Sequence, residues 1–384
     1  AACRVADVAL TPSPRWRGRG TRGSVTARGD DAPRHPPSGH PPVSRLLRTL
    51  AVALVALVGV VHAAHAQALQ DVLLVTDTRL NRVVALDRFD GRIVNPSFIR
   101  GSAGGPFNLL TPRAAIAVGS EIWVSDQSPS VNGIWRFDRS GSFLGLVGGN
   151  VAGGGLSNVR GMRVIGGVVH VVNAGSTNGA PGPSIVRIGL DGTILGSFST
   201  NVNPDVGASP WDVIEVGGRL LVSDGTSRAI QQFDMSGTYL GALTGALNNI
   251  PQQLATLANG NLLLAAQGST PAGSFGTYEI GADGSVVRRW TGSPALGTRG
   301  VYQLGNGRYL ISESGGASTT RGLGTIDPDG PATAANFTLI EGLWNGGWIS
   351  EARIVATVVP EPSSVVLLGT GLVALVAVGR RRRG

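Results

Sequence analysis

Short runs of apolar and β-branched residues, many of them alternating with polar ones, recur along the chain between residues 69 and 358. Val72–Asp77, Ile122–Asp126 and Leu220–Asp224 are typical runs, and each ends on an acidic residue. Gly, Asp, Ser and Asn separate the runs from one another. Runs of this length and composition, bounded by turn-forming residues, predict β-strands.

The predicted strands belong to a unit that repeats six times. In each unit a polar residue followed by Gly stands between two apolar runs, at Asp90-Gly91, Ser140-Gly141, Asp191-Gly192, Ser236-Gly237, Asp283-Gly284 and Asp329-Gly330. Consecutive pairs are 50, 51, 45, 47 and 46 residues apart. Such a pair predicts a β-hairpin, because Gly readily adopts the positive φ that a tight turn requires. The hairpin supplies the third and fourth strands of each unit.

Two further runs complete the unit. A first strand such as Gly161–Ile165 is followed by a second strand such as Val168–Asn173. Four short antiparallel strands repeated every 40–50 residues are typical of a β-propeller blade. We therefore predict an all-β fold, a six-bladed β-propeller over residues 69–358. A pair of β-sandwiches or a parallel β-solenoid explains the repeat less well.

The ends of the repeat predict how the ring closes. The first unit begins at its second strand, near Asp71, while Trp348–Val355 is left over after the last unit and reads as a first strand. Pairing this run with the first unit would place both ends of the propeller in one sheet. Closure of this kind removes the exposed sheet edges that invite aggregation.

Charge changes the view of the two ends of the chain. The formal net charge is +8, and all 32 cationic residues are Arg. Residues 1–66 contain nine Arg and three acids, residues 360–384 contain four Arg and one acid, and the residues between them carry a net charge of −1. The basicity therefore belongs to the ends, which argues against nucleic acid as a partner of the propeller. The only Cys is Cys3, so no intramolecular disulfide is possible.

The N-terminal region divides into a leader and a targeting segment. Residues 1–44 are rich in Arg, Pro and Gly; we interpret them as an over-extended gene model, the alternative being a disordered basic arm that binds polyanions. Residues 45–66 combine two Arg, an apolar run and the small residues Ala64 and Ala66, which predicts a signal peptide for the Sec translocon, cleaved after Ala66 or Ala68. An N-terminal membrane anchor is the alternative.

The C-terminal region, residues 359–384, has three parts in a fixed order. Pro360, Glu361 and Pro362 precede an apolar stretch of about 17 residues from Ser363 to Gly379, and four cations follow: Arg380, Arg381, Arg382 and Arg383. The apolar stretch predicts a transmembrane helix, and the cations act as a membrane stop on the cytoplasmic side. This layout resembles the PEP-CTERM sorting signal of Gram-negative bacteria, with a plain C-terminal anchor as the alternative. The resemblance implies an exosortase as partner and an association with exopolysaccharide. It also implies that the protein is exported, first anchored in the inner membrane, and later located in the outer envelope or outside the cell.

Polar residues that end the second strands are the main candidates for chemistry. Five of them recur at equivalent positions, and carboxylate and amide oxygens are ligands for Ca²⁺: Asp77, Asp126, Asn173, Asp224 and Glu313. One hypothesis is therefore a Ca²⁺-dependent lactonase or esterase. The alternative is that each side chain caps backbone donors of the turn that follows it. The blade pattern resembles six-bladed propellers of the NHL or gluconolactonase-like type, but their acidic catalytic set does not align with this chain.

Other candidate residues point away from catalysis. His170 is the only His of the predicted propeller and lies in an apolar strand, where a core or strand-face position is expected rather than a catalytic base. Six Trp residues are candidates either for stacking on carbohydrate or for packing between blades: Trp123, Trp135, Trp211, Trp290, Trp344 and Trp348. We therefore expect an exported binding or scaffold protein with polysaccharide as ligand and no certain cofactor, and a Ca²⁺-dependent hydrolase is the alternative.

Overall fold

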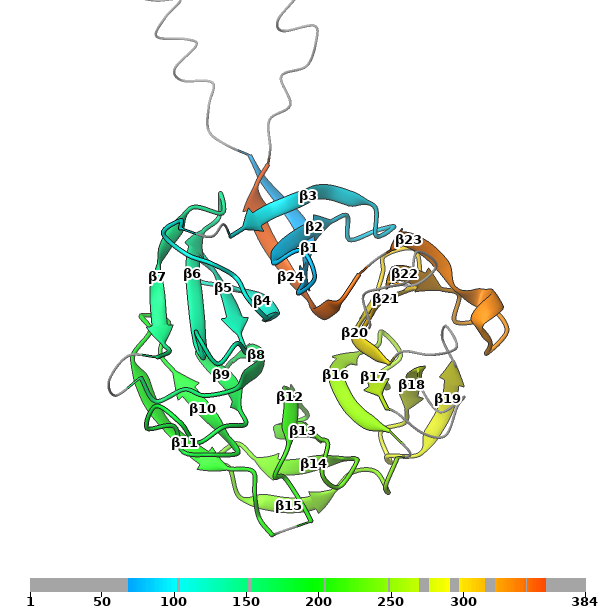
Figure 1. The fold of residues 1–384 in the computed structure, drawn as a ribbon. Helices are drawn as coiled ribbons and strands as arrows, with labels where there is room; N and C mark the ends of the chain where they lie inside the picture. The colour runs from blue at the N-terminus through cyan, green and yellow to red at the C-terminus, as the bar shows by residue number, and fades with distance from the viewer. Residues whose placement is uncertain are drawn as a thin grey trace, which may run out of the picture. The chain divides into compact units, whose positions relative to one another are not determined.

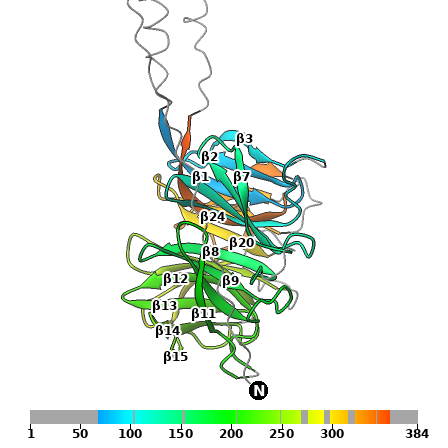
Figure 2. The same cartoon turned by 90° about the vertical axis from the view of Figure 1, so that its left-hand side faces the viewer.

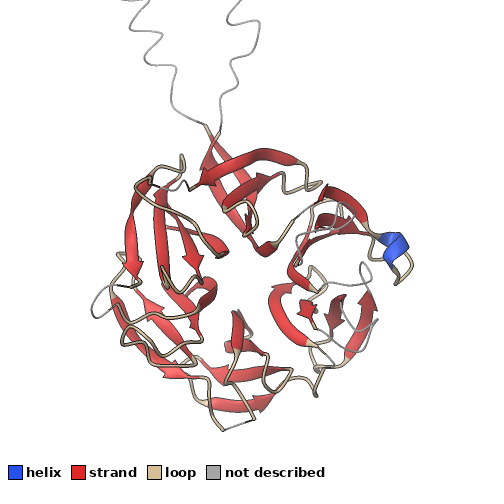
Figure 3. Ribbon diagram, in the orientation of Figure 1, coloured by secondary structure: helices blue, strands red, loops and turns tan. Residues whose placement is uncertain are grey.

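The propeller predicted from the sequence repeat is the fold of this chain (Figures 1 and 3). The computed structural model describes residues 68–356 except 102–103, 151–153, 204, 248, 269–275, 291–296, 315–321 and 343. The expectations for the leader, the signal peptide and the C-terminal sorting segment concern residues outside this part. Within the described residues, no helix has the length and apolar character needed to cross a membrane.

Six four-stranded antiparallel sheets form the six blades. Blade 1 contains β24 (Gly346–Val355), β1 (Leu69–Asp77), β2 (Arg82–Leu86) and β3 (Ile93–Arg100). Blade 2 contains β4 (Pro112–Val118), β5 (Glu121–Asp126), β6 (Gly133–Asp138) and β7 (Phe143–Gly148). Blade 3 contains β8 (Val159–Ile165), β9 (Val168–Asn173), β10 (Ser184–Ile188) and β11 (Ile194–Ser199).

The remaining blades repeat this order. Blade 4 contains β12 (Pro210–Val216), β13 (Arg219–Asp224), β14 (Ala229–Asp234) and β15 (Tyr239–Ala242). Blade 5 contains β16 (Ile250–Thr256), β17 (Leu262–Gln267), β18 (Gly276–Ile280) and β19 (Val286–Trp290). Blade 6 contains β20 (Thr298–Gln303), β21 (Tyr309–Glu313), β22 (Gly322–Ile326) and β23 (Thr338–Gly342), with the 3₁₀ helix η1 (Ala334–Asn336) between its last two strands. The first-listed strand of every blade lies nearest the centre of the ring (Figure 1).

The ring closes as the leftover strand predicts. β24 pairs antiparallel with β1 from Leu69↔Val355 to Asp77↔Gly346, with one register shift between Val75 and Asp77, and it supplies the inner strand of blade 1. The start of β1 and the end of β24 consequently lie side by side (Figures 1 and 2). Blade 1 is thus built from both ends of the propeller, and its hydrogen bonds hold the ring shut.

The hairpin turns are as predicted in five of the six blades. The glycines of these turns have a positive φ: Gly91, Gly141, Gly192, Gly237 and Gly284. At Gly237 a Cβ would lie 2.3 Å from the Phe198 ring of the preceding blade, so the close contact between blades also requires Gly. Gly330 does not have a positive φ; it still ends a turn, in which its amide donates to the carbonyl of Asp327 at 3.1 Å, but η1 follows and makes the sixth hairpin longer.

The core lies between neighbouring blades. Val83 and Ile99 of blade 1, for example, pack with Ile122 and Phe137 of blade 2 in one buried cluster. Four of the six candidate Trp residues of the propeller are at most 1% exposed, namely Trp123, Trp290, Trp344 and Trp348. These four pack inside the protein, in agreement with the packing alternative, whereas Trp135 and Trp211 are half-buried.

Candidate functional site

The five polar residues predicted from the repeat lie at one end of the blades. Each closes the second strand of a different blade, opposite the first residues of the inner strand, and each is at most 2% exposed: Asp77, Asp126, Asn173, Asp224 and Glu313. Their positions agree with the repeat. They belong to five blades, so they are distributed around the ring rather than gathered at one point.

Backbone donors occupy the carboxylates of Asp126 and Asp224. Asp126 accepts hydrogen bonds from the amides of Leu110, Thr111 and Ser128, at 2.8–3.0 Å. Asp224 accepts from the amides of Gly207, Ser209, Thr226 and Ser227. These amides belong to the turn after the strand and to the connection that enters the inner strand. Each carboxylate therefore ties two loops of its own blade together.

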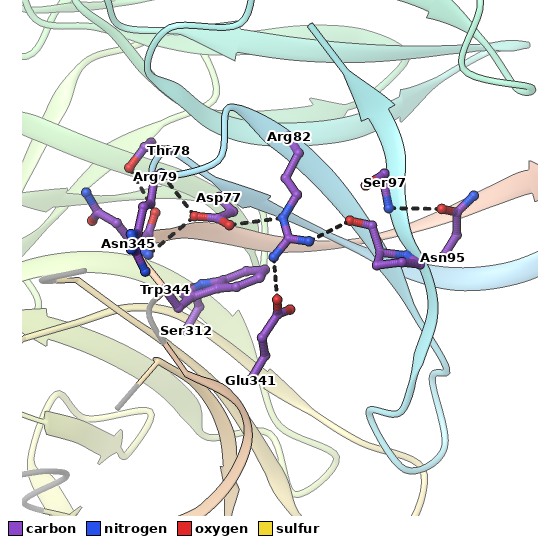
Figure 4. A network of polar contacts seen from close by, with 11 residues as sticks. Asp77, Thr78, Arg79, Arg82, Asn95, Ser97, Ser312, Glu341, Trp344 and Asn345 are labelled. Atoms are coloured by element: carbon purple, nitrogen blue, oxygen red, sulfur yellow. Dashed lines mark hydrogen bonds and ion pairs between the residues drawn. The ribbon is translucent and has the colours of Figure 1, made fainter. Parts of the chain in front are cut away.

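Asp77 has a different set of partners at the junction of blades 1 and 6 (Figure 4). Its carboxylate accepts from Nε of Arg82 at 3.0 Å, and a second nitrogen of Arg82 donates to Glu341 of blade 6 at 2.6 Å. The Arg82 guanidinium also lies 5.5 Å from the centre of the Trp344 ring. This network joins the first blade to the last, which gives Asp77 a role in ring closure.

Asn173 and Glu313 also bind the backbone. The Asn173 side chain accepts from the amide of Ser157 and donates to the carbonyls of Gly175 and Gly182. Glu313 accepts from the amide of Gly322 at 3.2 Å. Across the part of the chain that the structure describes, no three His, Cys, Asp or Glu side chains are grouped in a way that could hold a metal ion. The observed contacts are those of the capping alternative, and Ca²⁺ binding by these residues stays a prediction.

The residue before Asp77, Asp126 and Asp224 has a function that the sequence reasoning missed. Thr76 and Ser125 donate their hydroxyls to the carbonyls of Arg113 and Arg160 in the following blade, at 2.8 and 2.7 Å. Ser223 does the same to the carbonyl of Gln252 at 2.6 Å. The recurring Ser-Asp and Thr-Asp pairs in the sequence could have revealed this contact between blades. In each pair the hydroxyl binds the next blade, while the carboxylate caps the loops of its own blade.

Side chains of the inner strands meet across the centre of the ring, which is called the central channel below. Trp348 of blade 1 stacks on Trp211 of blade 4, with ring centres 6.3 Å apart and planes 16° apart. Gln253 of blade 5 donates to the carbonyl of Ile349 at 2.6 Å and accepts from its amide at 2.8 Å. Trp348 and Gln253 are each 1% exposed. The channel thus has two separate ends.

A pocket of about 630 Å³ occupies one of these ends. All six inner strands contribute to its wall, with these hydrogen-bonding side chains: Arg163, Glu215, Gln253, Thr256, Tyr302, Gln303, Ser350 and Glu351. Apolar residues such as Ile116 and Ile214 lie between them. Along the inner strands, the pocket residues come after the residues that pair with the five predicted polar side chains. The pocket therefore lies at the other end of the inner strands from those five side chains. None of those five residues lines it.

Two polar networks shape the pocket. The hydroxyl of Tyr302 donates to Glu351, which also forms an ion pair with Arg88 at 2.8 Å. Burial, together with this contact to Glu351, raises the pKa of Tyr302. Arg163 of the pocket wall lies 3.6 Å from the buried Asp212 and donates to the carbonyl of Leu254. Burial raises the pKa of Asp212 to about 6, although Arg163 acts in the opposite direction.

His170 lies in the apolar strand β9 and is the cross-strand partner of Arg163 in β8. It is 4% exposed in β9, and its Nδ1 lies 3.2 Å from the carbonyl of Val168. Burial is the main cause that lowers the pKa of His170.

Comparison with known proteins identifies one motif and the fold. Residues 358–383 match the PEP-CTERM protein-sorting motif, which confirms the resemblance found in the C-terminal sequence. A protein of unknown function from Bacteroides caccae has a similar structure, with 17% identity, a TM-score of 0.51, and coverage of 73% of this chain and 98% of that chain.

Two further solved structures are similar. The nidogen/laminin complex matches at 15% identity with a TM-score of 0.51, over 74% of this chain and 98% of that chain. A virginiamycin B lyase from Staphylococcus aureus matches at 14% identity with a TM-score of 0.47, over 76% of this chain and 94% of that chain. No curated protein matches the sequence. At these identities the similarity concerns the propeller fold alone.

Proposed function

We propose that this protein is a polysaccharide-binding module of the bacterial envelope. The premise is that the chain is a β-propeller and carries an exosortase sorting motif. The observation that carries the proposal is the pocket at one end of the channel. Its volume of about 630 Å³ falls in the range of ligand pockets, which is roughly 300–1,000 Å³. The sorting motif implies processing by an exosortase, and the polysaccharide of the envelope is a ligand that such a protein would meet.

The composition of the wall supports a hydroxyl-rich ligand. Glu215, Glu351 and Gln303 offer oxygen acceptors, Arg163 offers donors, and apolar positions lie between them. Tyr302 adds a half-buried aromatic ring, which can pack against the apolar face of a sugar while its hydroxyl remains hydrogen-bonded. Many spaced acceptors and donors around an aromatic group suit a sugar better than a purely apolar compound.

The test is retention of the propeller, residues 67–358, on an array of bacterial glycans. The ring of this fragment is closed by its own first and last strands. Tyr302→Ala and Gln303→Ala should weaken the retained interaction at least tenfold. Leu195→Ser, an exposed position on an outer strand, is the control that should leave binding unchanged. Retention of no glycan, or equal retention by all variants, contradicts the proposal.

The alternative, a Ca²⁺-dependent lactonase or esterase, is tested with the same preparation. It predicts that Ca²⁺ raises the melting temperature and that the protein hydrolyses lactone or ester substrates. A binding module instead gives glycan retention without turnover.

A further inference from the structure

The second end of the channel, opposite the pocket, is surrounded by positively charged side chains. Each inner strand places one residue at this end, immediately after the residue that pairs with the last or next-to-last position of the second strand. These six equivalent positions are Arg113, Arg160, Trp211, Gln252, Arg299 and Gly347. A shift in register occurs at this point in every blade. Irregularities of this kind re-aim side chains, and they are common next to functional sites. Arg113, Arg160 and Arg299 are called the arginine rim below.

The partners of the arginine rim are neutral. Arg113 donates to the Gln127 side chain at 2.5 Å, and Arg160 donates to the carbonyl of Pro210 at 2.6 Å. Arg299 donates to the Asn345 side chain at 3.1 Å. The ion pairs found in the described part of the chain involve other arginines. Three guanidinium groups thus share this end without forming an ion pair to any described carboxylate.

The nearest carboxylates do not neutralise the arginine rim. Asp126 and Asp224 act on Arg113 and Arg160 from a distance, but their oxygens accept hydrogen bonds from backbone amides. Burial lowers the pKa of Arg113 to about 10 and that of Arg160 and Arg299 to about 9, and the charge of Arg113 contributes to both of the latter decreases. The charge of Arg113 in blade 2 therefore acts on those of Arg160 in blade 3 and Arg299 in blade 6. All three remain cationic at neutral pH.

Several buried polar atoms at this end have no hydrogen-bond partner among the residues that the structure describes. They are Nη1 of Arg113, Nε of Arg160, Nε1 of Trp211 and both polar atoms of the Gln252 side chain. Arg160 is 8% exposed and Gln252 is fully buried, so neither has ready access to bulk water. The Arg160 guanidinium lies 3.6 Å from the centre of the Trp211 ring, which fixes its plane. Buried donors normally find an acceptor, and unpartnered ones indicate a site for a bound group.

We propose that the arginine rim binds an oxyanion, and that its ligand is the carboxylate of an acidic sugar in a polysaccharide. Guanidinium groups bind carboxylates through two parallel hydrogen bonds, and a bound anion would offset the mutual repulsion of the three cations. Arg113 and Arg299 are only half-buried, so the anion can approach from solvent. The choice of a sugar acid rests on the proposed function, whereas the anion site rests on the rim alone.

The experiment is calorimetric titration of the propeller, residues 67–358, with three probes: a trimer of galacturonic acid, a trimer of galactose and inorganic phosphate. We expect the galacturonic acid trimer to bind, with an affinity that falls as salt is added, and the neutral trimer not to bind at this end. Arg113→Gln and Arg299→Gln should each weaken binding of the acidic trimer at least tenfold. Arg219→Gln removes the same charge from an exposed position near the opposite end of the blades, so it should leave the affinity unchanged.

Three results would overturn the proposal. Unchanged affinity in both rim variants, with melting temperatures showing that they are folded, rules out the rim as the site. Binding of phosphate but not of the uronic acid, with the same dependence on Arg113, rules out the carboxylate. Loss of binding in Tyr302→Ala but not in the rim variants assigns the acidic trimer to the pocket, so the rim proposal and the pocket proposal fail separately.

Discussion

The substitution Asp224→Asn tests whether the recurring geometry of the blades depends on a carboxylate that caps loops. Asp224 is fully buried and accepts four backbone amides and the hydroxyl of Ser227, shared between its two oxygens. An amide presents one oxygen and one NH₂ group. Whichever way the introduced Asn side chain is oriented, at least two backbone amides lose their acceptor and face another donor.

The expected loss follows from these contacts. A buried donor left without an acceptor costs about 1–3 kcal/mol, so two such donors should lower the free energy of unfolding by about 2–6 kcal/mol. For a domain of this size, that corresponds to a decrease in the melting temperature of roughly 3–10 °C. Differential scanning calorimetry and urea unfolding measure both quantities.

Two further variants make the test specific. Asn173→Asp is the reciprocal change: it places a carboxylate against the carbonyls of Gly175 and Gly182, and it should destabilise the protein as well. Asp283→Asn, on an exposed hairpin turn, should change stability little. A decrease below about 1 kcal/mol for Asp224→Asn would refute the capping role. A Ca²⁺-induced rise in melting temperature that Asp224→Asn abolishes would support the metal-ligand hypothesis instead.

Three other predictions concern the blade contacts, the pH dependence and the sorting motif. Ser125→Ala removes the hydroxyl that binds the carbonyl of Arg160 and the amide of Ala114, so urea unfolding should show a loss of about 2–3 kcal/mol, in contrast to the exposed Ser140→Ala. Burial raises the pKa of Asp212 to about 6 in the folded state, so its contribution to stability is complete below pH 3.8 and is lost as the pH rises through 6. Asp212→Asn should remove this decline in stability. Urea unfolding midpoints of both proteins at pH 4.5 and pH 7 would show the difference. Replacing Pro360, Glu361 and Pro362 with Ala should leave an unprocessed, membrane-retained form in cell fractions, with Ser363→Ala as the control; normal processing would contradict the assigned role of the motif.

The repeat could be predicted from the sequence because its determinants are local. Alternation within a strand and a polar residue followed by Gly at a hairpin act over a few residues, so the six blades and the leftover strand Trp348–Val355 are visible without a structure. The sixth hairpin differs because Gly330 is followed by η1, a departure that the Asp-Gly pair does not encode. The end of the blades at which the five polar side chains lie also follows from the register.

The two ends of the channel could not be predicted, because each is assembled from residues about fifty positions apart. Tyr302 and Glu351 come together through the neighbouring inner strands of blades 6 and 1, and no short motif contains both. Arg113, Arg160 and Arg299 occupy equivalent places in three blades, but an Arg in a strand gives no sign of whether an acid will lie beside it. The Trp residues were equally ambiguous, since burial against a neighbouring blade depends on how the blades pack.

The central claim is that the channel of this exported propeller binds polysaccharide. A crystal structure of the propeller with an oligosaccharide retained on the glycan array tests it most directly. We predict a sugar in the pocket, in contact with Tyr302 and within hydrogen-bond distance of Glu215, Gln303 or Glu351. A sugar bound only on the outer strands of the blades, away from both ends of the channel, would contradict the claim.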